Sequence, residues 1–459
     1  MQQNRLKRAI LPVLLLLAMA LLAVPAQAAE SGAAPSFQVK SDAQIAGDFK
    51  LLQGDGNGLT AEYLGRATLR YQAAIMSLRL QGLEKDAVSY SGSAQFADGS
   101  LVFGTTRAVL GYLKTRPELG WQGTDGGRFD PLAPVTAQQF YKIMLEALGY
   151  KEGADFKFED TLSFAKSKGL YRAASASPFR NQDIATAVVE ALKTPLKGST
   201  DTLAQTLVKQ GSADAAATAA LSYKRLDIAA NAKLGNYLVD ENGRTLYYFT
   251  KDVADPNSCK AGPCLNAWPI YDNETLQVPA ALQASDFGRF LRTDGKTQLT
   301  YKGWPLYYYA PDKNPGDVLG EDVNHVWFVL KVPDYSVMIA TNPTLGNYLT
   351  DNQGRTLYYF DKDMVGMSAC SGPCLKAWPP FYSPNVVVPS GLNASDFGSL
   401  KLSDGSMATT YKGYPLYYYV SDTKRGDTAG QGFKDVWFVV NPAKFSGTKA
   451  QQAMENMAH

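Results

Sequence analysis

The second half of the chain repeats itself, and this repetition constrains the fold more than any other feature. The segment Leu234-Gly-Asn-Tyr-Leu recurs 111 residues later from Leu345, and the segment Gly243-Arg-Thr-Leu-Tyr-Tyr-Phe recurs from Gly354. Two copies of this length indicate two equivalent structural units. We therefore predict two tandem units, residues 222–332 and 333–443.

Each unit also contains a shorter internal echo. The pattern Gly-x-x-Leu-Tyr-Tyr-aromatic-x-x-Asp occurs four times, and its copies end at Asp252, Asp312, Asp363 and Asp422. In every copy a turn containing glycine separates two short runs rich in Tyr, Leu and Thr, which is typical of a β-hairpin. Both units are thus expected to be antiparallel β structure.

The region before the repeats has a different periodicity. Stretches such as 136–148 and 184–192 place apolar residues at helical spacing, and Pro134 and Pro195 flank them. We predict a mainly helical region over residues 40–210. The Ala-rich segment 211–221 would be a linker or a connecting helix, and residues 444–459 would be a polar tail. The fold class is therefore multidomain, mainly α and then two tandem antiparallel all-β repeats.

The N-terminus has the features of a secretory signal peptide. Arg5, Lys7 and Arg8 precede the apolar run 9–24, and small residues end the segment at Ala28. We predict cleavage after residue 28, export from the cell and no transmembrane segment afterwards. The 45 Lys and Arg, three of which lie in the signal, balance 43 Asp and Glu, so the mature chain has no electrostatic footprint for nucleic acid.

Four cysteines form two close pairs, Cys259 with Cys264 and Cys370 with Cys374. In an exported protein such pairs indicate local disulfides, with a redox dithiol or a metal site as alternatives. Neither pair has the Cys-x-x-Cys spacing, and the two histidines lie outside any cysteine cluster. We predict two structural disulfides, with Trp268 and Trp378 packed against them.

A shared function should use side chains that both repeats keep. His325 fails this criterion because Asp435 stands at its place in the second repeat, so no catalytic triad can be common to both. The motif carboxylates Asp252, Asp312, Asp363 and Asp422 meet it. We predict that they cap turns by accepting backbone N–H groups. A Ca²⁺ site and a glycosidase that uses paired carboxylates are the alternatives.

The motif aromatics are the other candidates for a site. Neighbouring side chains of a strand face opposite ways, so Tyr247 and Phe249, and likewise Tyr358 and Phe360, share one face. One face fills the core, which leaves two possibilities for the remaining tyrosines. They either pair across strands and stabilise the sheet, which we favour, or form an exposed row that binds sugar rings.

The two units resemble a family of bacterial exported repeats of unknown function, known as predicted lipoproteins with a Tyr-x-aromatic-x-x-Asp motif. The motif stands here as Tyr247-x-Phe249-x-x-Asp252 and Tyr358-x-Phe360-x-x-Asp363. The resemblance implies a location in the cell envelope. This chain differs from the lipoprotein pattern because it has no cysteine near the cleavage site.

The helical region resembles a series of S-layer homology modules, through Leu119-Gly-Trp-Gln-Gly-Thr-Asp-Gly-Gly-Arg-Phe-Asp-Pro and the helix that follows Thr136. In their family these modules hold proteins to pyruvylated cell-wall polysaccharide through Thr-Arg-x-Glu, a signature that no unit here keeps whole. The resemblance makes Arg70, Thr136 and Arg180 candidate polymer contacts.

Together these features predict a non-catalytic, secreted protein at the cell surface. The helical region would associate with cell-wall polysaccharide, and the repeats would bind a protein or carbohydrate ligand without a resident cofactor. A redox or metal-handling envelope protein and a glycosidase are the alternative functions.

Overall fold

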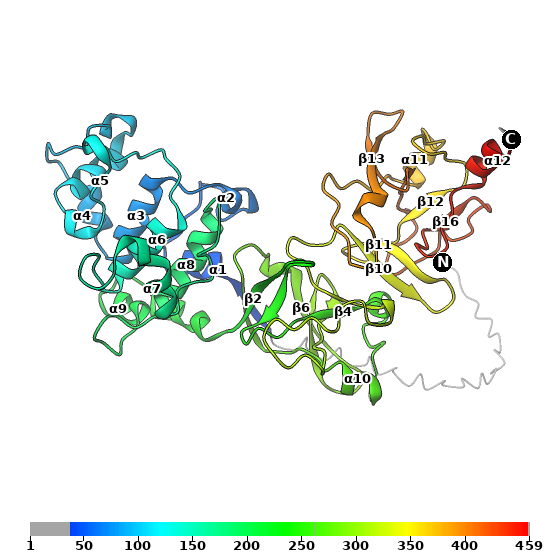
Figure 1. The fold of residues 1–459 in the computed structure, drawn as a ribbon, viewed down its shortest axis with the longest axis horizontal. Coiled ribbons are helices and arrows are strands. Elements are labelled where there is room, and N and C mark those ends of the chain that lie inside the picture. The colour runs from blue at the N-terminus through cyan, green and yellow to red at the C-terminus, as the bar shows by residue number, and fades with distance from the viewer. Residues whose placement is uncertain (1–36, 261, 458–459) are drawn as a thin grey trace, which may run out of the picture. The chain divides into compact units, whose positions relative to one another are not determined.

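The computed structural model describes residues 37–260 and 262–457, so the predicted signal peptide lies outside the described part. Helices dominate up to Lys209, and small antiparallel sheets in tandem repeats follow (Figure 1). The predicted fold class is thereby confirmed. The segment 211–221 contains the 3₁₀ helix Ala215–Ser222, so a short helical turn connects the two regions.

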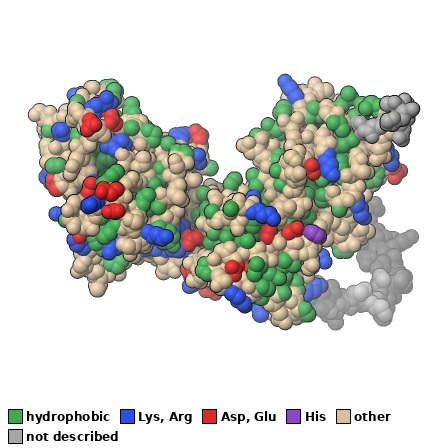
Figure 2. All heavy atoms as spheres, in the orientation of Figure 1, with side chains coloured by type: hydrophobic (Ala, Val, Ile, Leu, Met, Phe, Trp, Pro, Cys, Tyr) green, Lys and Arg blue, Asp and Glu red, His purple; other side chains and the backbone are tan. Residues whose placement is uncertain are grey.

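Charged side chains of both signs are mixed over the face shown in Figure 2. In the described residues, no helix is both long and apolar enough to cross a membrane.

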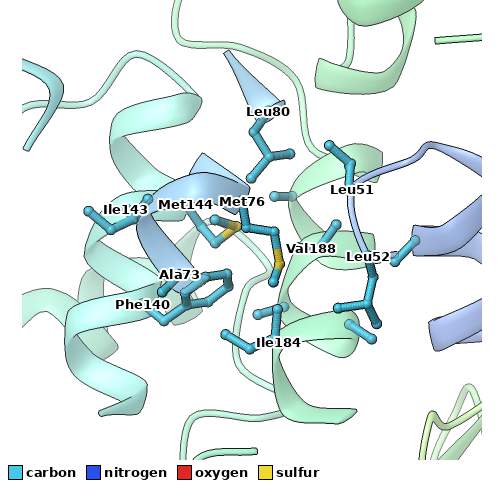
Figure 3. Close-up of a cluster of buried hydrophobic side chains, with 14 of the residues drawn as sticks. Leu51, Leu52, Ala73, Met76, Leu80, Phe140, Ile143, Met144, Ile184 and Val188 are labelled. Atoms are coloured by element: carbon cyan, nitrogen blue, oxygen red, sulfur yellow. The ribbon is translucent and has the colours of Figure 1, made fainter. Parts of the chain in front are cut away.

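The helical region consists of short helices packed around one apolar core. Figure 3 shows Met76, Met144, Ile184 and Val188 pointing toward one another inside it. The helices are α1 (Asp42–Asp48), α2 (Ala61–Gly65), α3 (Arg70–Leu80), α4 (Glu84–Val88), α5 (Gly104–Lys114), α6 (Ala137–Ala147), α7 (Thr161–Ser167), α8 (Asn181–Lys193) and α9 (Leu203–Lys209).

The first residues of α3, α6 and α8 lie close together. The segments that precede these helices form isolated β-bridges, Ala67 with Arg180 and Leu69 with Pro134. Helix α6 begins with a capping box, in which the Thr136 hydroxyl accepts the Gln139 N–H and the Gln139 amide oxygen accepts the Thr136 N–H. Three helix N-termini therefore share one edge of the region.

Both repeats share the same antiparallel strand pairs. In the first repeat, β2 pairs with β3, β4 with β9, and β6 with β7 and then β8, all antiparallel. The strands are β2 (Lys224–Asn231), β3 (Gly235–Asp240), β4 (Tyr247–Phe249), β5 (Thr275–Val278), β6 (Phe287–Leu291), β7 (Thr297–Tyr301), β8 (Trp304–Pro305) and β9 (Trp327–Val329).

The second repeat has the corresponding pairs β10 with β11, β12 with β16, and β13 with β14 and then β15. Its strands are β10 (Val337–Asn342), β11 (Gly346–Asp351), β12 (Tyr358–Phe360), β13 (Phe397–Lys401), β14 (Met407–Tyr411), β15 (Tyr414–Pro415) and β16 (Trp437–Val439). After each first cysteine comes a short helix, α10 (Pro263–Ala267) or α11 (Pro373–Ala377).

The hairpin turns follow from local chemistry. The Asp240 carboxylate accepts the backbone N–H groups of Asn242 and Arg244, which fixes the turn between β3 and β4. Gly243 has a φ of +77°, and a Cβ there would lie 2.8 Å from Pro315. Glycine is thus required at this position both by the backbone angle and by space.

One pairing was not predicted from the sequence. Strand β1 (Gln38–Ser41) pairs in parallel with β5 of the first repeat, so the sheet order there is β1-β5-β2-β3. The Asp42 carboxylate that follows β1 accepts a hydrogen bond from Gln277 and forms an ion pair with Arg172. The start of the helical region is therefore integrated into the first repeat.

The two repeats meet at Arg425. Its guanidinium donates to the carbonyl oxygens of Lys302 and Gln353 and lies 4.5 Å from the ring centroid of Trp304. Burial lowers the pKa of Arg425 to about 10. A second link joins the hydroxyl groups of Thr250 and Thr341, whose oxygens are 2.6 Å apart.

The C-terminal segment, expected to be a polar tail, contributes to the second repeat. The Phe445 ring is buried and meets Tyr359 edge to face, with centroids 4.8 Å apart. Thr448 is buried as well and donates to the backbone oxygen of Asp363, and helix α12 (Lys449–Met457) follows. This segment closes one end of the repeat's core.

From the packing of the helical region's core we can predict how far a cavity lowers the free energy of unfolding. Replacing the fully buried Phe140 by alanine should lower the free energy of unfolding by about 3–5 kcal/mol, because the cavity adds to the lost apolar transfer. Urea unfolding followed by far-ultraviolet circular dichroism measures this. Phe103→Ala is the matched control, since Phe103 is 79% exposed and its loss should cost less than about 0.5 kcal/mol. Equal effects of the two substitutions would contradict the packing described here.

Candidate functional site

The motif residues of each repeat form a reciprocal pair of tyrosine–aspartate hydrogen bonds. In the first repeat the Tyr247 hydroxyl donates to Asp312 at 2.7 Å, and the Tyr307 hydroxyl donates to Asp252 at 2.8 Å. Tyr247 and Tyr307 also exchange backbone hydrogen bonds of 2.9 and 3.0 Å. The tyrosine of each motif copy is thus bound to the aspartate of the other copy.

The second repeat has the same arrangement. The Tyr358 hydroxyl donates to Asp422 at 2.6 Å, and the Tyr417 hydroxyl donates to Asp363 at 2.9 Å. The backbones of Tyr358 and Tyr417 exchange hydrogen bonds of 2.8 and 3.0 Å. The fourfold occurrence of the motif in the sequence therefore corresponds to two crossed pairs in space.

The second oxygen of every motif carboxylate accepts a backbone N–H from the loop that follows it, as turn capping requires. The Asp252 and Asp363 carboxylates accept the N–H groups of Ser258 and Ala369, at 3.1 and 2.7 Å. Asp312 and Asp422 accept the N–H groups of Leu319 and Ala429, each at 3.0 Å. Each aspartate thus holds a loop and a tyrosine at the same time.

Burial changes the acidity of these groups. It raises the pKa of Asp252 well above its usual range and that of Asp363 to about 7, although the tyrosine hydroxyl and the backbone N–H act in the opposite direction. The pKa values of Asp312 and Asp422 are raised for the same reason. The motif carboxyls are therefore weaker acids than exposed aspartates.

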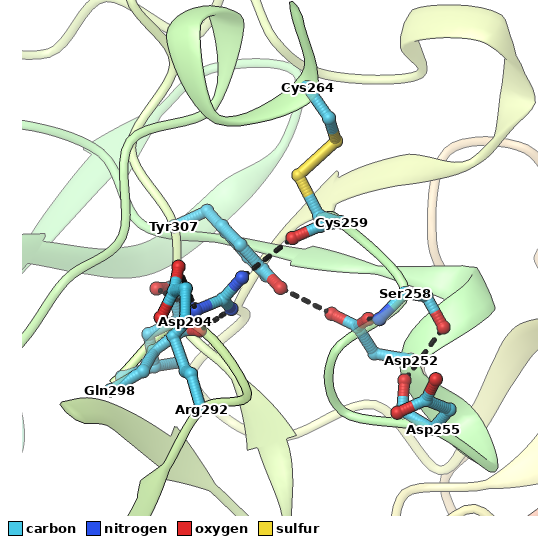
Figure 4. Close-up of a disulfide and its surroundings, with 10 residues drawn as sticks. Asp252, Asp255, Ser258, Cys259, Cys264, Arg292, Asp294, Gln298 and Tyr307 are labelled. Atoms are coloured by element: carbon cyan, nitrogen blue, oxygen red, sulfur yellow. Dashed lines mark hydrogen bonds and ion pairs between the residues drawn. A yellow bond between two sulfur atoms is a disulfide. The ribbon is translucent and has the colours of Figure 1, made fainter. Parts of the chain in front are cut away.

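The two repeats differ in what surrounds the first aspartate. Near Asp252, the buried Arg292 donates to Gln298 and to the backbone oxygen of Cys259 (Figure 4), and its positive charge lowers the Asp252 pKa. Leu402 and Ala408 stand at the corresponding positions of the second repeat. There the Ser368 hydroxyl lies 2.7 Å from the Tyr417 hydroxyl instead. Asp363 therefore lacks the cationic neighbour that Asp252 has.

A stack of four aromatic rings lies beside each crossed pair. In the first repeat the order is Phe249, Trp327, Trp268 and Tyr309, with centroid separations of 4.1, 3.8 and 4.2 Å. The second repeat has the same stack, in the order Phe360, Trp437, Trp378 and Tyr419. The centroids of successive rings are 4.3, 3.8 and 4.1 Å apart. The part that Trp327 and Trp437 take in these stacks was not predicted from the sequence. The presence of the Trp-Phe segment in both units was the available signal.

Both predicted disulfides, Cys259–Cys264 and Cys370–Cys374, are confirmed. Cys259 and Trp268 belong to one buried cluster, and Cys370 and Trp378 belong to another. All four cysteines are therefore paired.

The alternative of an exposed tyrosine row is wrong for the first copy of the motif in each unit. Tyr247, Tyr248 and Tyr358 are fully buried, and Phe249 and Phe360 are also buried. Both faces of β4 are covered because β4 lies between two apolar clusters. These five rings thus belong to the core, whereas Tyr308, Tyr359 and Tyr418 are half-buried.

The motif carboxylates are poorly placed for the Ca²⁺ and glycosidase alternatives. Asp252 and Asp363 are at most 1% exposed, and both oxygens of each already accept a hydrogen bond. Within residues 37–260 and 262–457, no three His, Cys, Asp or Glu side chains are grouped so that they could hold a metal ion.

The three candidate polymer contacts differ in accessibility. Arg70 is buried, donates to the Phe129 carbonyl oxygen at 2.9 Å, and packs over the rings of Phe129 and Trp121. It is a core residue, contrary to the prediction, because its aliphatic stem enters the core at the start of α3. Thr136 and Arg180 are exposed at the first turns of α6 and α8.

Four segments of the chain, residues 229–271, 288–331, 340–382 and 398–441, match one family model, described as a secreted repeat of unknown function. These segments, all in the second half of the chain, are similar to that family. Each predicted unit therefore contains two of the matched segments, and the crossed tyrosine–aspartate pairs join one to the other. The predicted resemblance of the units to this family is confirmed.

Residues 129–212, which contain α6 to α9, match the N-terminal domain of the X-prolyl dipeptidyl aminopeptidase PepX. This match does not support the S-layer homology resemblance, which rests on its own motifs. No curated protein and no solved structure matches the chain.

Because Tyr307 belongs to a crossed pair, we expect that removing its hydroxyl group lowers stability more than removing the hydroxyl group of Tyr309. Tyr307→Phe should lower the free energy of unfolding by about 1–3 kcal/mol, because the buried Asp252 loses a hydrogen-bond donor. Tyr309→Phe is the control, since Tyr309 is half-buried and the described structure gives its hydroxyl no hydrogen bond. Chemical denaturation followed by tryptophan fluorescence measures both. A Tyr307→Phe protein as stable as Tyr309→Phe would refute the role of the pair.

From the raised pKa of Asp363 we predict that the free energy of unfolding depends on pH. Its folded pKa of about 7 exceeds the ordinary value of 3.8, so the neutral carboxyl stabilises the fold. That contribution is fully present below pH 3.8 and is lost as the pH rises through 7, at a cost of up to roughly 4 kcal/mol. Asp363→Asn should make the decline smaller in a series of urea unfolding curves between pH 4 and 8, while the part due to the other buried motif aspartates remains. Asp404→Asn, at an exposed turn, should leave the decline unchanged.

Proposed function

We propose that this chain is a non-catalytic, secreted surface protein, in which the helical region associates with cell-wall polysaccharide and the repeats bind a ligand. The main support for the proposal is that the residues of the repeated motif make contacts with one another. In both repeats the motif's tyrosines, aspartates and tryptophans are engaged with one another inside the core. A repeat built in this way is a rigid scaffold, and binding specificity lies on the surface around it.

Wall association is supported by the common edge of α3, α6 and α8. Arg180 is exposed there, and its guanidinium is suited to a bidentate contact with an acidic sugar substituent. Thr136 adds an exposed position at the start of α6. The partial positive charges of the three helix N-termini favour an anionic polymer at this edge.

Ligand binding by the first repeat is supported by a polar hollow of about 240 Å³. Its lining combines both charge signs with aromatic rings, as in sites for polar ligands such as carbohydrates. The Tyr308 ring forms one wall, with its hydroxyl bound to Asp240 and the Arg244 guanidinium 3.9 Å from its centroid. Lys224, Arg225 and Asp272 lie around it.

A sedimentation experiment with isolated cell-wall sacculi tests wall association. The full mature chain should sediment with the sacculi, and Arg180→Ala should reduce the bound fraction severalfold because the exposed guanidinium is lost. Arg107→Ala, which removes an exposed arginine of α5, is the matched control and should leave the bound fraction unchanged.

Removal of the secondary polymer from the sacculi should abolish the binding. Failure of the unmodified chain to sediment would overturn the wall-association part of the proposal. An equal loss with Arg107→Ala would indicate general charge attraction instead of a site.

A further inference from the structure

The two repeats differ in whether a strand covers the outer edge of one segment, which is β5 in the first repeat and residues 385–388 in the second. In the first repeat, β1 covers β5 along its whole length, from Gln38 beside Thr275 to Ser41 beside Val278. The Gln38 N–H also donates to the Glu274 carbonyl oxygen at 3.0 Å. As a result Leu276, Gln277 and Val278 are all fully buried.

Among residues 37–260 and 262–457, no strand pairs with that side of the corresponding segment of the second repeat, residues 385–388. Val387 is bound on its inner side, where its carbonyl oxygen accepts the N–H groups of Ser336 and Val337, and its N–H donates to the Ser336 hydroxyl. Val386 and Val388 make no backbone hydrogen bond within the described residues. All three valines are only half-buried.

The face next to this edge is uncovered too. In the first repeat Leu282, Ala284 and Phe287 are at most 9% exposed. Leu392 and Phe397, which take the corresponding positions in the second repeat, are half-buried, and Ala394 is exposed. Tyr382 adds a ring that is 45% exposed. The second repeat thus presents an apolar surface at the place that β1 and the start of α1 cover in the first.

The composition of this segment differs from that of a protected edge. Residues 380–395 contain no charged side chain, whereas the first repeat has Asp272 and Glu274 in the corresponding stretch. Exposed edges are usually blocked by charges, bulges or prolines. Here the prolines, Pro384 and Pro389, stand outside residues 385–388 and leave the N–H groups of the three valines in place. Three successive valines, of which Val386 and Val388 have free outward backbone groups, have the properties of a strand-addition site.

We propose that the edge formed by residues 385–388, with Leu392 and Phe397 beside it, binds an extended segment of a partner protein as a parallel strand. The β1 strand of this chain shows the chemistry that fits, because Phe37 and Val39 pack against the first repeat at alternate positions. The partner strand therefore carries apolar side chains at positions i and i+2. This inference specifies the partner of the proposed binding role and does not depend on wall association.

The chain's own β1 is not the occupant. It is held on the first repeat through its full register, and Asp42 after it is bound to Gln277 and Arg172. Releasing it would leave these buried polar groups without their partners. The occupant is therefore a strand of another protein.

Binding of a synthetic peptide with the sequence of residues 36–42 to the full mature chain tests the inference. Fluorescence anisotropy should show saturable binding, which a peptide with Phe37 and Val39 replaced by lysine lacks. Val386→Pro, which removes an outward N–H, and Leu392→Lys should each weaken binding by roughly tenfold or more. Val420→Lys, at a valine of the same repeat that is 55% exposed, is the matched control and should change it less than twofold.

Amide hydrogen exchange keeps the test decisive if a variant fails to fold. In the unmodified chain the peptide should slow exchange at Val386 and Val388, whereas Val387, whose N–H is already bound to Ser336, should change little. A spin label at the peptide's N-terminus should broaden signals near Asn385 more than those near Val388, because the predicted strand is parallel.

Three outcomes would overturn the inference: no peptide binding, binding unaffected by Val386→Pro, or an antiparallel label pattern. Concentration-dependent dimerisation that Val386→Pro abolishes, in the absence of peptide binding, would assign the edge to a second copy of the chain instead. None of these results affects the sedimentation of the chain with sacculi, so failure of this inference is distinguishable from failure of the proposed wall association.

Discussion

The exchange of tyrosine and aspartate between motif copies is the interaction on which each repeat depends. In a single copy the buried aspartate keeps the N–H of its own loop, but its other oxygen would lack a donor, and an unpaired buried polar atom is costly. The second copy supplies the missing hydroxyl, while its own aspartate receives the hydroxyl of the first. This reciprocity explains why the motif occurs in pairs here, since a lone copy leaves one oxygen of its carboxylate unsatisfied. The disulfide, the loops capped by the aspartates and the tryptophan stack are arranged around this exchange.

The same exchange limits what the repeats can do chemically. Because the four bonded tyrosines, Tyr247, Tyr307, Tyr358 and Tyr417, are fully buried, their hydroxyl groups are withdrawn from solvent in both repeats, and differences between the repeats lie around them. Arg292 near Asp252 has no counterpart near Asp363, so the two carboxyls have different electrostatic surroundings despite the same hydrogen bonds. A shared core with divergent surroundings fits a scaffold better than a pair of identical active sites.

The sequence predicted most of this fold, because local patterns determine it. Helical spacing located the first region, and the fourfold glycine-to-aspartate motif located the hairpins. It could not predict that Tyr247 bonds Asp312 rather than the nearer Asp252, because crossing is a property of how two hairpins meet. Nor could alternation along β4 reveal that both of its faces are covered, since that requires knowledge of the clusters on either side. Arg70 shows the same limit: a basic side chain at a helix start resembled a surface contact, but its stem and guanidinium pack against Trp121 and Phe129.

The pairing of β1 with β5 shows why repeats equal in sequence need not be equal in function. Strand β1, which precedes the first repeat in the chain, pairs with the edge of that repeat. The second repeat is preceded by the first repeat instead, so only the first repeat is covered by a strand of the described chain. The valines at 386–388 occupy positions that are fully buried in the first repeat, and their half-exposure follows from this difference in what precedes each repeat. An apolar, uncharged edge that is protected in one copy and open in the other is difficult to explain as a requirement of folding alone. Both copies attain the same antiparallel strand pairs and the same crossed tyrosine–aspartate pairs, so the open edge is free to serve binding.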